Sequence, residues 1–302
     1  DRAKLERGYY ESLLSVDRFN SQLWEVYAKK PSNWLDVDSA NLKRFVGGFV
    51  QVELIPSYVY DSTHGRISIN RWGMRDRDYE LQPGPETFRA IVLGPSTVMG
   101  WGVGDGETFE ALLEQRLNEE RPDGAFRKFE LLNCGVPGYQ PPQQLVAFER
   151  CMQFKPTSVM YVATGREISR AARYLVEVTQ KGVEIPYAPL RAIVEKAGLG
   201  REMDESTALR ALEPYRSEIV RFVYSHIAEQ AKSRGAQPVW IFLPQVRDGA
   251  WREETPEAKR LAEQAGFLVI NLEDVYKGLD INTIRLAEWD DHPNVRGHQI
   301  VA

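Results

Sequence analysis

The sequence predicts an α/β protein, a three-layer α/β/α sandwich with a five-stranded parallel sheet at its centre and an N-terminal extension. From Thr87 onward, strand-like and helix-like segments alternate along the chain. The strand-like segments are nearly continuous apolar runs, and the segments between them are amphipathic and of helical length. Because strands that are apolar on both faces need cover on both faces, helices are expected on each side of a parallel sheet.

The predicted elements follow one another after the extension. Five strands are predicted, at residues 88–94, 129–135, 158–164, 238–244 and 267–272. Helices are predicted between them, at residues 107–120, 143–154, within a long block at 206–234, and at 256–266. The insert after the third strand, about residues 168–236, predicts either a helical cap over the site or a lengthened crossover.

The region before the sheet has a different character. Residues 1–85 are predicted to be an N-terminal extension that packs on the core, and residues 86–302 to be the main domain. The extension opens with a charged stretch of helical type at 2–19 and closes on a Pro/Gly turn at 81–86. The chain opens at Asp1 without a methionine, which is consistent with the removal of an upstream signal or anchor. The compartment stays open between periplasmic or other extracytoplasmic locations and the cytoplasm.

Composition limits the class of protein. The chain has 302 residues, 43% hydrophobic and 27% charged, and no apolar run long enough to cross a bilayer. A net charge of −5 argues against a general nucleic-acid binder, whose surface is basic. The cysteines, Cys134 and Cys151, form neither a disulfide framework nor a metal-binding pattern, so two buried free thiols are expected. Neither a metal nor an organic cofactor is expected.

Two distant positions carry residues suited to nucleophilic catalysis. The apolar run 88–93 breaks at Gly94, and Ser96 follows, so a strand is predicted to deliver this hydroxyl to its carboxyl end. Asp290 and His292 lie near the end of the sequence, two residues apart, and point the same way in extended backbone. Serine is a poor nucleophile alone; it needs an imidazole to accept its proton and a carboxylate to orient that imidazole.

Four ordered blocks of sequence resemble the SGNH (GDSL-like) hydrolase superfamily, which includes esterases and O-acetyltransferases. The blocks cover about residues 65–302 and read NRWGMRDRDYE, FRAIVLGPSTVMGWGVGDGETFEALLEQRL, LLNCGVPGYQPPQQL and DDHPNVRGH. The resemblance implies an SGNH/flavodoxin-like sheet, Ser96 as nucleophile, His292 as general base and Asp290 as the orienting carboxylate, with Asp291 in reserve. It also implies that the backbone N–H groups of Ser96 and Gly138 stabilise the oxyanion, in a block that begins at Asn133.

Two blocks depart from the family pattern. Proline stands at position 95, where the family has the aspartate of Gly-Asp-Ser. Arg166 and Glu167 stand where asparagine and aspartate are expected. Arg166 is predicted either to donate to the oxyanion or to pair with Glu167 and fill the site. The segment 70–77 is predicted either to contact a sugar or, as the favoured interpretation, to pack the extension onto the sheet.

The remaining histidines are given structural interpretations. We expect His298 in a terminal helix, His226 on an amphipathic helix, and His64 in a surface loop, with a position lining the cleft as its alternative.

The leading hypothesis is a serine esterase that acts on a small ester, with O-acetyl groups of a glycan as the candidate substrate. An O-acetyltransferase is the first alternative. The second alternative is a non-catalytic glycan-binding or assembly module on the same fold. A nucleotide-binding domain is disfavoured, because the first strand leads to no G-x-G-x-x-G fingerprint.

Overall fold

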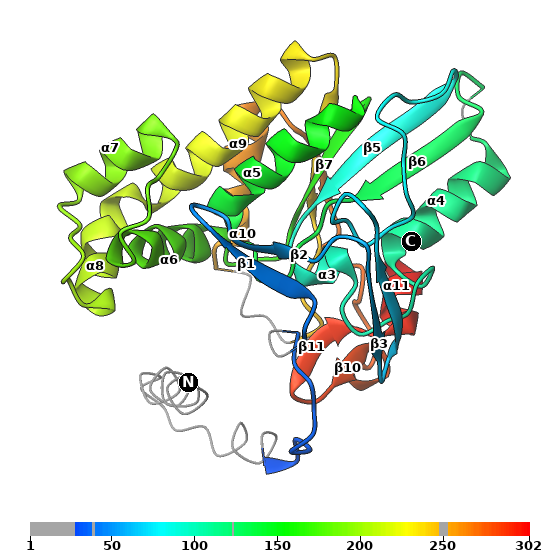
Figure 1. Ribbon diagram of the computed structural model, residues 1–302, viewed down its shortest axis with the longest axis horizontal. Coiled ribbons are helices and arrows are strands. Elements are labelled where there is room, and N and C mark those ends of the chain that lie inside the picture. The colour runs from blue at the N-terminus through cyan, green and yellow to red at the C-terminus, as the bar shows by residue number, and fades with distance from the viewer. Residues whose placement is uncertain (1–27, 38–39, 123, 248–252) are drawn as a thin grey trace.

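The computed structural model describes residues 28–37, 40–122, 124–247 and 253–302. The charged stretch at 2–19 lies outside these residues. Figure 1 shows one central sheet with helices on both sides of it. Within the described residues, no helix combines the length and the apolar character needed to cross a membrane.

A five-stranded parallel sheet forms the centre, in the order β6-β5-β7-β8-β9. Its strands are β5 (Thr87–Leu93), β6 (Lys128–Asn133), β7 (Ser158–Ala163), β8 (Gln237–Phe242) and β9 (Leu268–Asn271). The predicted fold class is confirmed, and each predicted strand overlaps an observed one. β5 lies between β6 and β7, so the residues that follow it lie near the carboxyl ends of two neighbouring strands, where sites in open parallel sheets lie.

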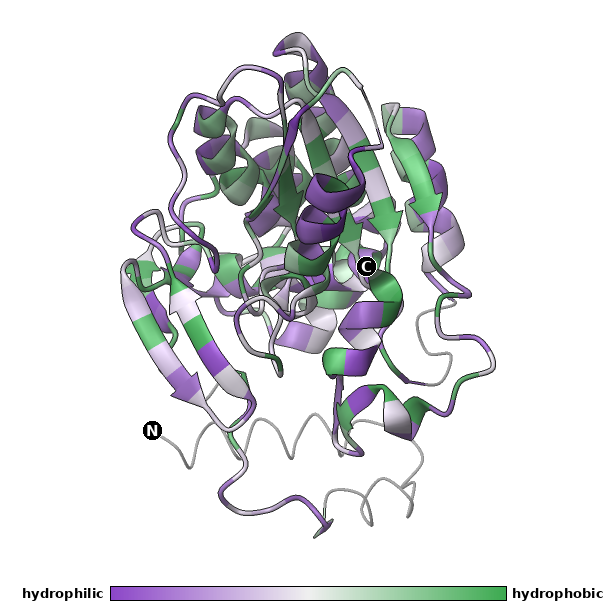
Figure 2. Ribbon diagram, turned by 90° about the vertical axis from the view of Figure 1, so that its right-hand side faces the viewer, coloured by the Kyte–Doolittle hydropathy of each residue, from purple (hydrophilic) through white to green (hydrophobic). Residues whose placement is uncertain are grey.

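Helices cover both faces of this sheet (Figure 1). Helices α4 (Phe109–Glu120) and α11 (Val295–Val301) pack together on one face. Helices α5 (Pro141–Cys151), α9 (Arg216–Ser233) and α10 (Thr255–Ala265) cover the other face. Alternate residues of β5 belong to two separate apolar cores, one on each side of the sheet, as the two-residue period of a strand requires. Figure 2 shows the apolar strands and the polar outer surfaces of the helices.

The long insert after β7 is a lengthened crossover. It contains α6 (Glu167–Gln180), α7 (Ala188–Lys196) and α8 (Glu205–Leu212), followed by a 3-10 turn at Glu213–Tyr215 and then α9. Helices α6 and α7 pack against α9, and α8 packs against α6. A second 3-10 turn, Met152–Phe154, follows α5.

The described part of the extension contains two antiparallel hairpins that the sequence did not predict. They are β1 (Lys43–Gly47) with β2 (Gln51–Leu54) and β3 (Tyr58–Ser62) with β4 (Gly65–Ile69). Side chains of the main domain hold the first hairpin by its backbone. The amide of Gln143 donates to the carbonyl of Val50 at 2.7 Å, and the hydroxyl of Tyr139 donates to that of Val52 at 2.8 Å.

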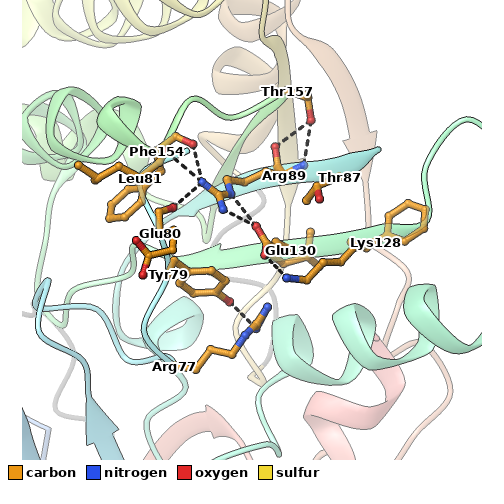
Figure 3. A network of polar contacts seen from close by, with 12 residues as sticks. Arg77, Tyr79, Glu80, Leu81, Thr87, Arg89, Lys128, Glu130, Phe154 and Thr157 are labelled. Carbon is orange, nitrogen blue, oxygen red and sulfur yellow. Dashed lines mark hydrogen bonds and ion pairs between the residues drawn. The ribbon is translucent and has the colours of Figure 1, made fainter. Parts of the chain in front are cut away.

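A buried ion pair closes the amino end of the sheet (Figure 3). Arg89 of β5 lies 2.6 Å from Glu130 of β6, and both side chains are 5% exposed or less. The same guanidinium donates to the carbonyls of Glu80, Leu81 and Phe154. The pair therefore fastens the end of the extension to the edge of the sheet.

A short hairpin, β10 (Arg285–Ala287) with β11 (Asp290–Pro293), precedes the last helix. A 3-10 turn, Ile281–Thr283, leads into it. The side chain of Asn294 caps α11 by accepting a hydrogen bond from the N–H of Gly297 at 3.1 Å. The terminal helix predicted to contain His298 is therefore confirmed.

Candidate active site

Ser96 begins a one-turn helix, α3 (Ser96–Met99), directly after β5. The turn between them is tight, because a Cβ on Gly94 would lie 2.3 Å from a methyl group of Val98. Pro95 precedes Ser96 with a φ of −84°, a value that suits proline, and its carbonyl accepts hydrogen bonds from the N–H groups of Val98 and Met99. Proline is thus compatible with the turn, although it offers no capping side chain.

The structure brings Ser96, His292 and Asp290 into direct contact. The Oγ atom of Ser96 lies 2.7 Å from Nε2 of His292. Nδ1 of His292 lies 2.6 Å from Oδ1 of Asp290. Both Asp290 and His292 belong to the extended strand β11, so the predicted two-residue spacing places both side chains on one side.

The charge of Asp290 assigns the protons of this chain of contacts. Burial alone would raise the pKa of Asp290, but its hydrogen bonds with the ring and the backbone N–H of His292 hold it below its ordinary value. An ionised carboxylate only accepts, so Nδ1 of His292 carries a proton and donates it. The neutral imidazole then accepts the Ser96 hydroxyl proton at Nε2, as a general base requires.

Asp291, the reserve carboxylate, has a different partner from Asp290. Its side chain pairs with Arg247 at 3.3 Å. Donor atoms of Asp290, Asp291 and His292 lie within 4.8 Å of one another, as a metal site would require, but each is already engaged with a protein partner. This group therefore fits a proton relay better than a metal site.

The two backbone N–H groups that the resemblance assigned to an oxyanion are those of Ser96 and Gly138. In the part of the chain that the structure describes, the N–H groups of Ser96 and Gly138 donate to no protein acceptor. Gly138 has a φ of +83°, which glycine adopts readily, and it is exposed. The N–H of Ser96 lies at the amino end of α3, although α3 is only one turn long.

Asn133, at the start of the second block, has a bracing role. Its side-chain amide is fully buried and donates to the carbonyl of Val98 at 2.8 Å and to Glu110 at 2.9 Å. Its side-chain oxygen accepts from the N–H of Gly135 at 3.1 Å. Asn133 therefore joins the strand that leads to Gly138 to the helix that carries Ser96.

The third block separates its two unusual residues. Glu167 is buried and accepts hydrogen bonds from the hydroxyls of Tyr161 at 2.7 Å and Tyr224 at 3.2 Å. Burial raises the pKa of Glu167, and these hydroxyls partly counter that rise. Arg166 precedes α6 with a φ of +55° and is exposed. The alternative in which Arg166 pairs with Glu167 is therefore wrong, since Glu167 faces the tyrosines.

Cys134 and Cys151 form a disulfide, so the prediction of two free thiols is wrong. Cys134 follows β6 and Cys151 ends α5, with their Cα atoms 6.8 Å apart. They are separated by 17 positions in the sequence, and the fold of the segment between them brings them together. The disulfide lies against a cavity of about 280 Å³ that Trp72 and Tyr139 also line.

The segment 70–77 packs against the core, as the favoured interpretation predicted. Arg75 is buried and donates to backbone carbonyls of residues 99–103, the turn after α3. Asp76 accepts a hydrogen bond from the N–H of Asn133 at 3.1 Å. Sequence reasoning weighed packing against contact with a sugar, and did not predict that Arg75 and Asp76 bond to the backbone on both sides of the site.

Acidic side chains gather around Asn133, which contacts the helix that Ser96 begins. Burial raises the pKa of Asp76 to about 7, partly offset by hydrogen bonds from Asn133 and Tyr79. Burial likewise raises the pKa of Glu110, and the charge of Asp76 raises it further. The pKa of Glu114 is also raised by burial.

The three other histidines have different surroundings. His298 is fully buried; burial lowers its pKa to about 3, so the neutral ring accepts the N–H of Phe109 at Nδ1, as a structural residue would. His226 lies on α9, as expected. His64 is half-buried, and burial lowers its pKa while the nearby charge of Asp290 opposes that change. His64 lies in the turn between β3 and β4, so it is in a loop, as expected.

Comparisons with known proteins identify similar folds at low identity. No protein-family model and no curated protein matches the chain. The α/β hydrolase LAE5, from the metagenome of Lake Arreo in Spain, is 16% identical, with a TM-score of 0.46, and the match covers 71% of this chain and 91% of that one. TesA is 16% identical over 70% of this chain and 93% of its own, with a TM-score of 0.45. A variant of Axe2, an acetyl xylan esterase from Geobacillus stearothermophilus, is 16% identical over 71% of this chain and 91% of its own, with a TM-score of 0.44.

Proposed function

We propose that this chain is a serine-dependent acyl-ester enzyme of the SGNH (GDSL-like) type. One observation carries the proposal: an unbroken line of contacts from the Ser96 hydroxyl through His292 to Asp290, with spacings of 2.7 and 2.6 Å. The three residues come from segments almost two hundred positions apart, and no packing requirement accounts for this arrangement of hydroxyl, ring and carboxylate. It is the arrangement that activates a serine.

The proposed reaction has two halves. Oγ of Ser96 bonds to the acyl carbon while its proton moves to Nε2 of His292, and the carbonyl electrons move onto the oxygen. The N–H groups of Ser96 and Gly138 stabilise that oxyanion, and Arg166 is the proposed third donor. The bond to the leaving alcohol then breaks, and the alcohol takes the proton from Nε2. Water or a second alcohol releases the acyl group by the reverse sequence of proton transfers.

The proposed substrate is a small ester, with O-acetyl groups on a glycan as the candidate. The resemblance in sequence and the name of Axe2 support this candidate without identifying the sugar. If water resolves the acyl-enzyme, the protein is a hydrolase; if a sugar hydroxyl does, it is an O-acetyltransferase. The disulfide adds the proposal that the chain works in an oxidising compartment, because such bonds persist there.

The test combines turnover and labelling. Wild-type protein is expected to hydrolyse p-nitrophenyl acetate and to gain the mass of a fluorophosphonate probe, whereas Ser96→Ala does neither. Ser233→Ala, which changes an exposed serine at the end of α9, is the matched control and retains both properties. An inactive and unlabelled wild type would favour the alternative, a non-catalytic glycan-binding or assembly module. Release of free acetate, compared with acetyl transfer to added xylo-oligosaccharide, separates hydrolase from transferase.

A further inference from the structure

A single buried arginine holds the turn that follows the candidate nucleophile. The side chain of Arg75 is 2% exposed. Its Nη1 donates to the carbonyls of Met99, at 3.1 Å, and of Gly100, and its Nη2 donates to the carbonyl of Val103 at 2.6 Å. A guanidinium has a rigid fork of donors, so carbonyls bound at two of its nitrogens are held at a fixed distance from each other.

This turn also contacts the reacting groups. The N–H groups of Gly100 and Trp101 donate to the carbonyl of Ser96 at 2.8 and 3.0 Å. Trp101, which follows Gly100 in this turn, is buried. A Cβ on Gly102 would lie 2.8 Å from Leu286 of β10, so the turn packs against the hairpin that carries His292.

Glycine is required where the guanidinium meets the turn. Gly100 follows α3 with a φ of +86°, and a Cβ there would lie 2.3 Å from a methyl group of Thr108 and 2.8 Å from Nη1 of Arg75. The arginine and the glycine therefore fit together as a matched pair. The adjacent Asp76 accepts the N–H of Asn133, whose strand leads to Gly138. Two successive residues thus contact both halves of the site.

We propose that Arg75 is a positioning residue of the active site, which sets the distance between Ser96 and His292 by fixing the turn at residues 99–103. This inference rests on the proposed function. Arg75 touches none of the reacting atoms; it acts through the backbone of the turn. A displacement of about 1 Å at a reacting atom costs on the order of a hundredfold in rate, so loss of the fork lowers kcat and leaves KM nearly unchanged.

The matched control is a second buried arginine with the same number of carbonyl acceptors. Arg89 donates to three carbonyls, pairs with Glu130, and lies at the amino end of β5, whereas Ser96 follows its carboxyl end. The comparison uses Arg75→Lys and Arg89→Lys, which both keep the charge and lose the fork. Arg75→Met is added to remove the charge.

The measurements are kcat and KM with p-nitrophenyl acetate, the rate constant of fluorophosphonate labelling, and the midpoint of thermal unfolding. Arg75→Lys is expected to lower kcat and the labelling rate tenfold to about a hundredfold with KM within about twofold, at a temperature where it is folded. Arg89→Lys is expected to lower the midpoint but to keep kcat within about threefold. If Arg75→Met unfolds, Arg75→Lys alone decides.

Each outcome points to one conclusion. Wild-type kcat in Arg75→Lys, or an equal loss of kcat in Arg89→Lys, overturns the positioning role while leaving the proposed function standing. An inactive, unlabelled wild type overturns the proposed function and this inference together.

Discussion

Two buried arginines at opposite ends of β5 have different surroundings. Arg89, at the amino end, contacts Glu130 at 2.6 Å, and Lys128 contacts the same carboxylate at 2.7 Å, so the buried charges are paired. Arg75 lies beside the carboxyl end. Its ion pair with Asp105 is longer, at 3.7 Å, and its guanidinium donates hydrogen bonds to carbonyls of the turn at residues 99–103.

The difference shows that a stabilising ion pair lies at the amino end of the sheet, whereas the candidate reacting groups lie at its carboxyl end. At the amino end, the buried ion pair of Arg89 and Glu130 joins β5 to β6, and within the described residues it contacts no candidate reacting group. At the carboxyl end, the acids Asp76 and Glu110 have raised pKa values, because burial disfavours their charge and neighbouring carboxylates, among them Glu114, add to the rise. Shifted pKa values of this kind concentrate at functional sites.

The largest effect is expected at the carboxyl end. Asp290→Asn removes the carboxylate charge and introduces an NH2 group that can donate to Nδ1, so the His292 tautomer is no longer fixed and kcat falls by about 10⁴, while the thermal midpoint changes little. Asp291→Asn is the matched control; it loses only a partly exposed pair with Arg247 and keeps kcat within about threefold. Steady-state kinetics of both variants test the assignment, and equal losses would contradict the choice of Asp290.

The reverse result is expected at the amino end. Arg89→Met leaves Glu130 without its buried partner, so the free energy of unfolding falls by about 3–5 kcal/mol. Urea unfolding measures this loss, and kcat of the folded protein stays near the wild-type value. Arg127→Met, which removes an exposed pair with Glu86, costs about 0.5 kcal/mol or less. A large loss of kcat in Arg89→Met would remove the distinction between the two ends.

The buried acid Asp76 predicts a pH dependence of stability. Its pKa is raised to about 7 in the folded protein, above the ordinary value of 3.8. Between these two pH values the folded state binds more protons than the unfolded state, so stability falls as pH rises and is lowest above pH 7. The penalty is at most about 4 kcal/mol.

Asp76→Asn removes this titration while keeping an oxygen that accepts the Asn133 N–H. We therefore expect the free energy of unfolding of wild type to fall between pH 5 and pH 8 relative to this variant, as measured by urea unfolding at several pH values. Asp78→Asn, on the same segment but exposed, follows wild type. Parallel curves for wild type and Asp76→Asn would show that Asp76 titrates in its ordinary range.

The disulfide joins Cys134, directly after β6, to Cys151 at the end of α5. Replacing both Cys134 and Cys151 by serine releases a loop of 17 positions, and closing a loop of that size contributes about 3 kcal/mol. We expect that loss in urea unfolding and a smaller effect on kcat. Wild type treated with reductant should match the double variant; an unchanged stability in both would show that the bond does not form.

The sheet was predictable from sequence because its signals are local. Apolar runs and amphipathic stretches identify strands and helices one by one, and their alternation implies the parallel order. Hairpins β1–β2 and β3–β4 were not predicted, since each strand is only four or five residues long and its burial follows contacts with the main domain.

The site was predictable only in part, because only some of its residues have a local signal in the sequence. Ser96, Asp290 and His292 stand in recognisable sequence blocks, so their meeting could be anticipated. The roles of Arg75 and Asn133 depend on which backbone groups surround them, and burial of an arginine leaves no periodic trace in sequence. The disulfide depends on α5 returning across the sheet, which no spacing of two cysteines encodes.

The smallest effect is expected at Arg166, where the sequence departs from the SGNH pattern that it otherwise resembles. Arg166 is exposed, and its backbone has a φ of +55° directly after the carboxyl end of β7. If its guanidinium donates to the oxyanion in the transition state, Arg166→Gln shortens the donor and removes its charge, so kcat falls by about tenfold with KM nearly unchanged. Arg173→Gln, an exposed arginine on the same helix, should leave kcat unchanged. Equal kcat in the two variants would show that Arg166 is no oxyanion donor, and would leave Ser96 and Gly138 as the proposed donors.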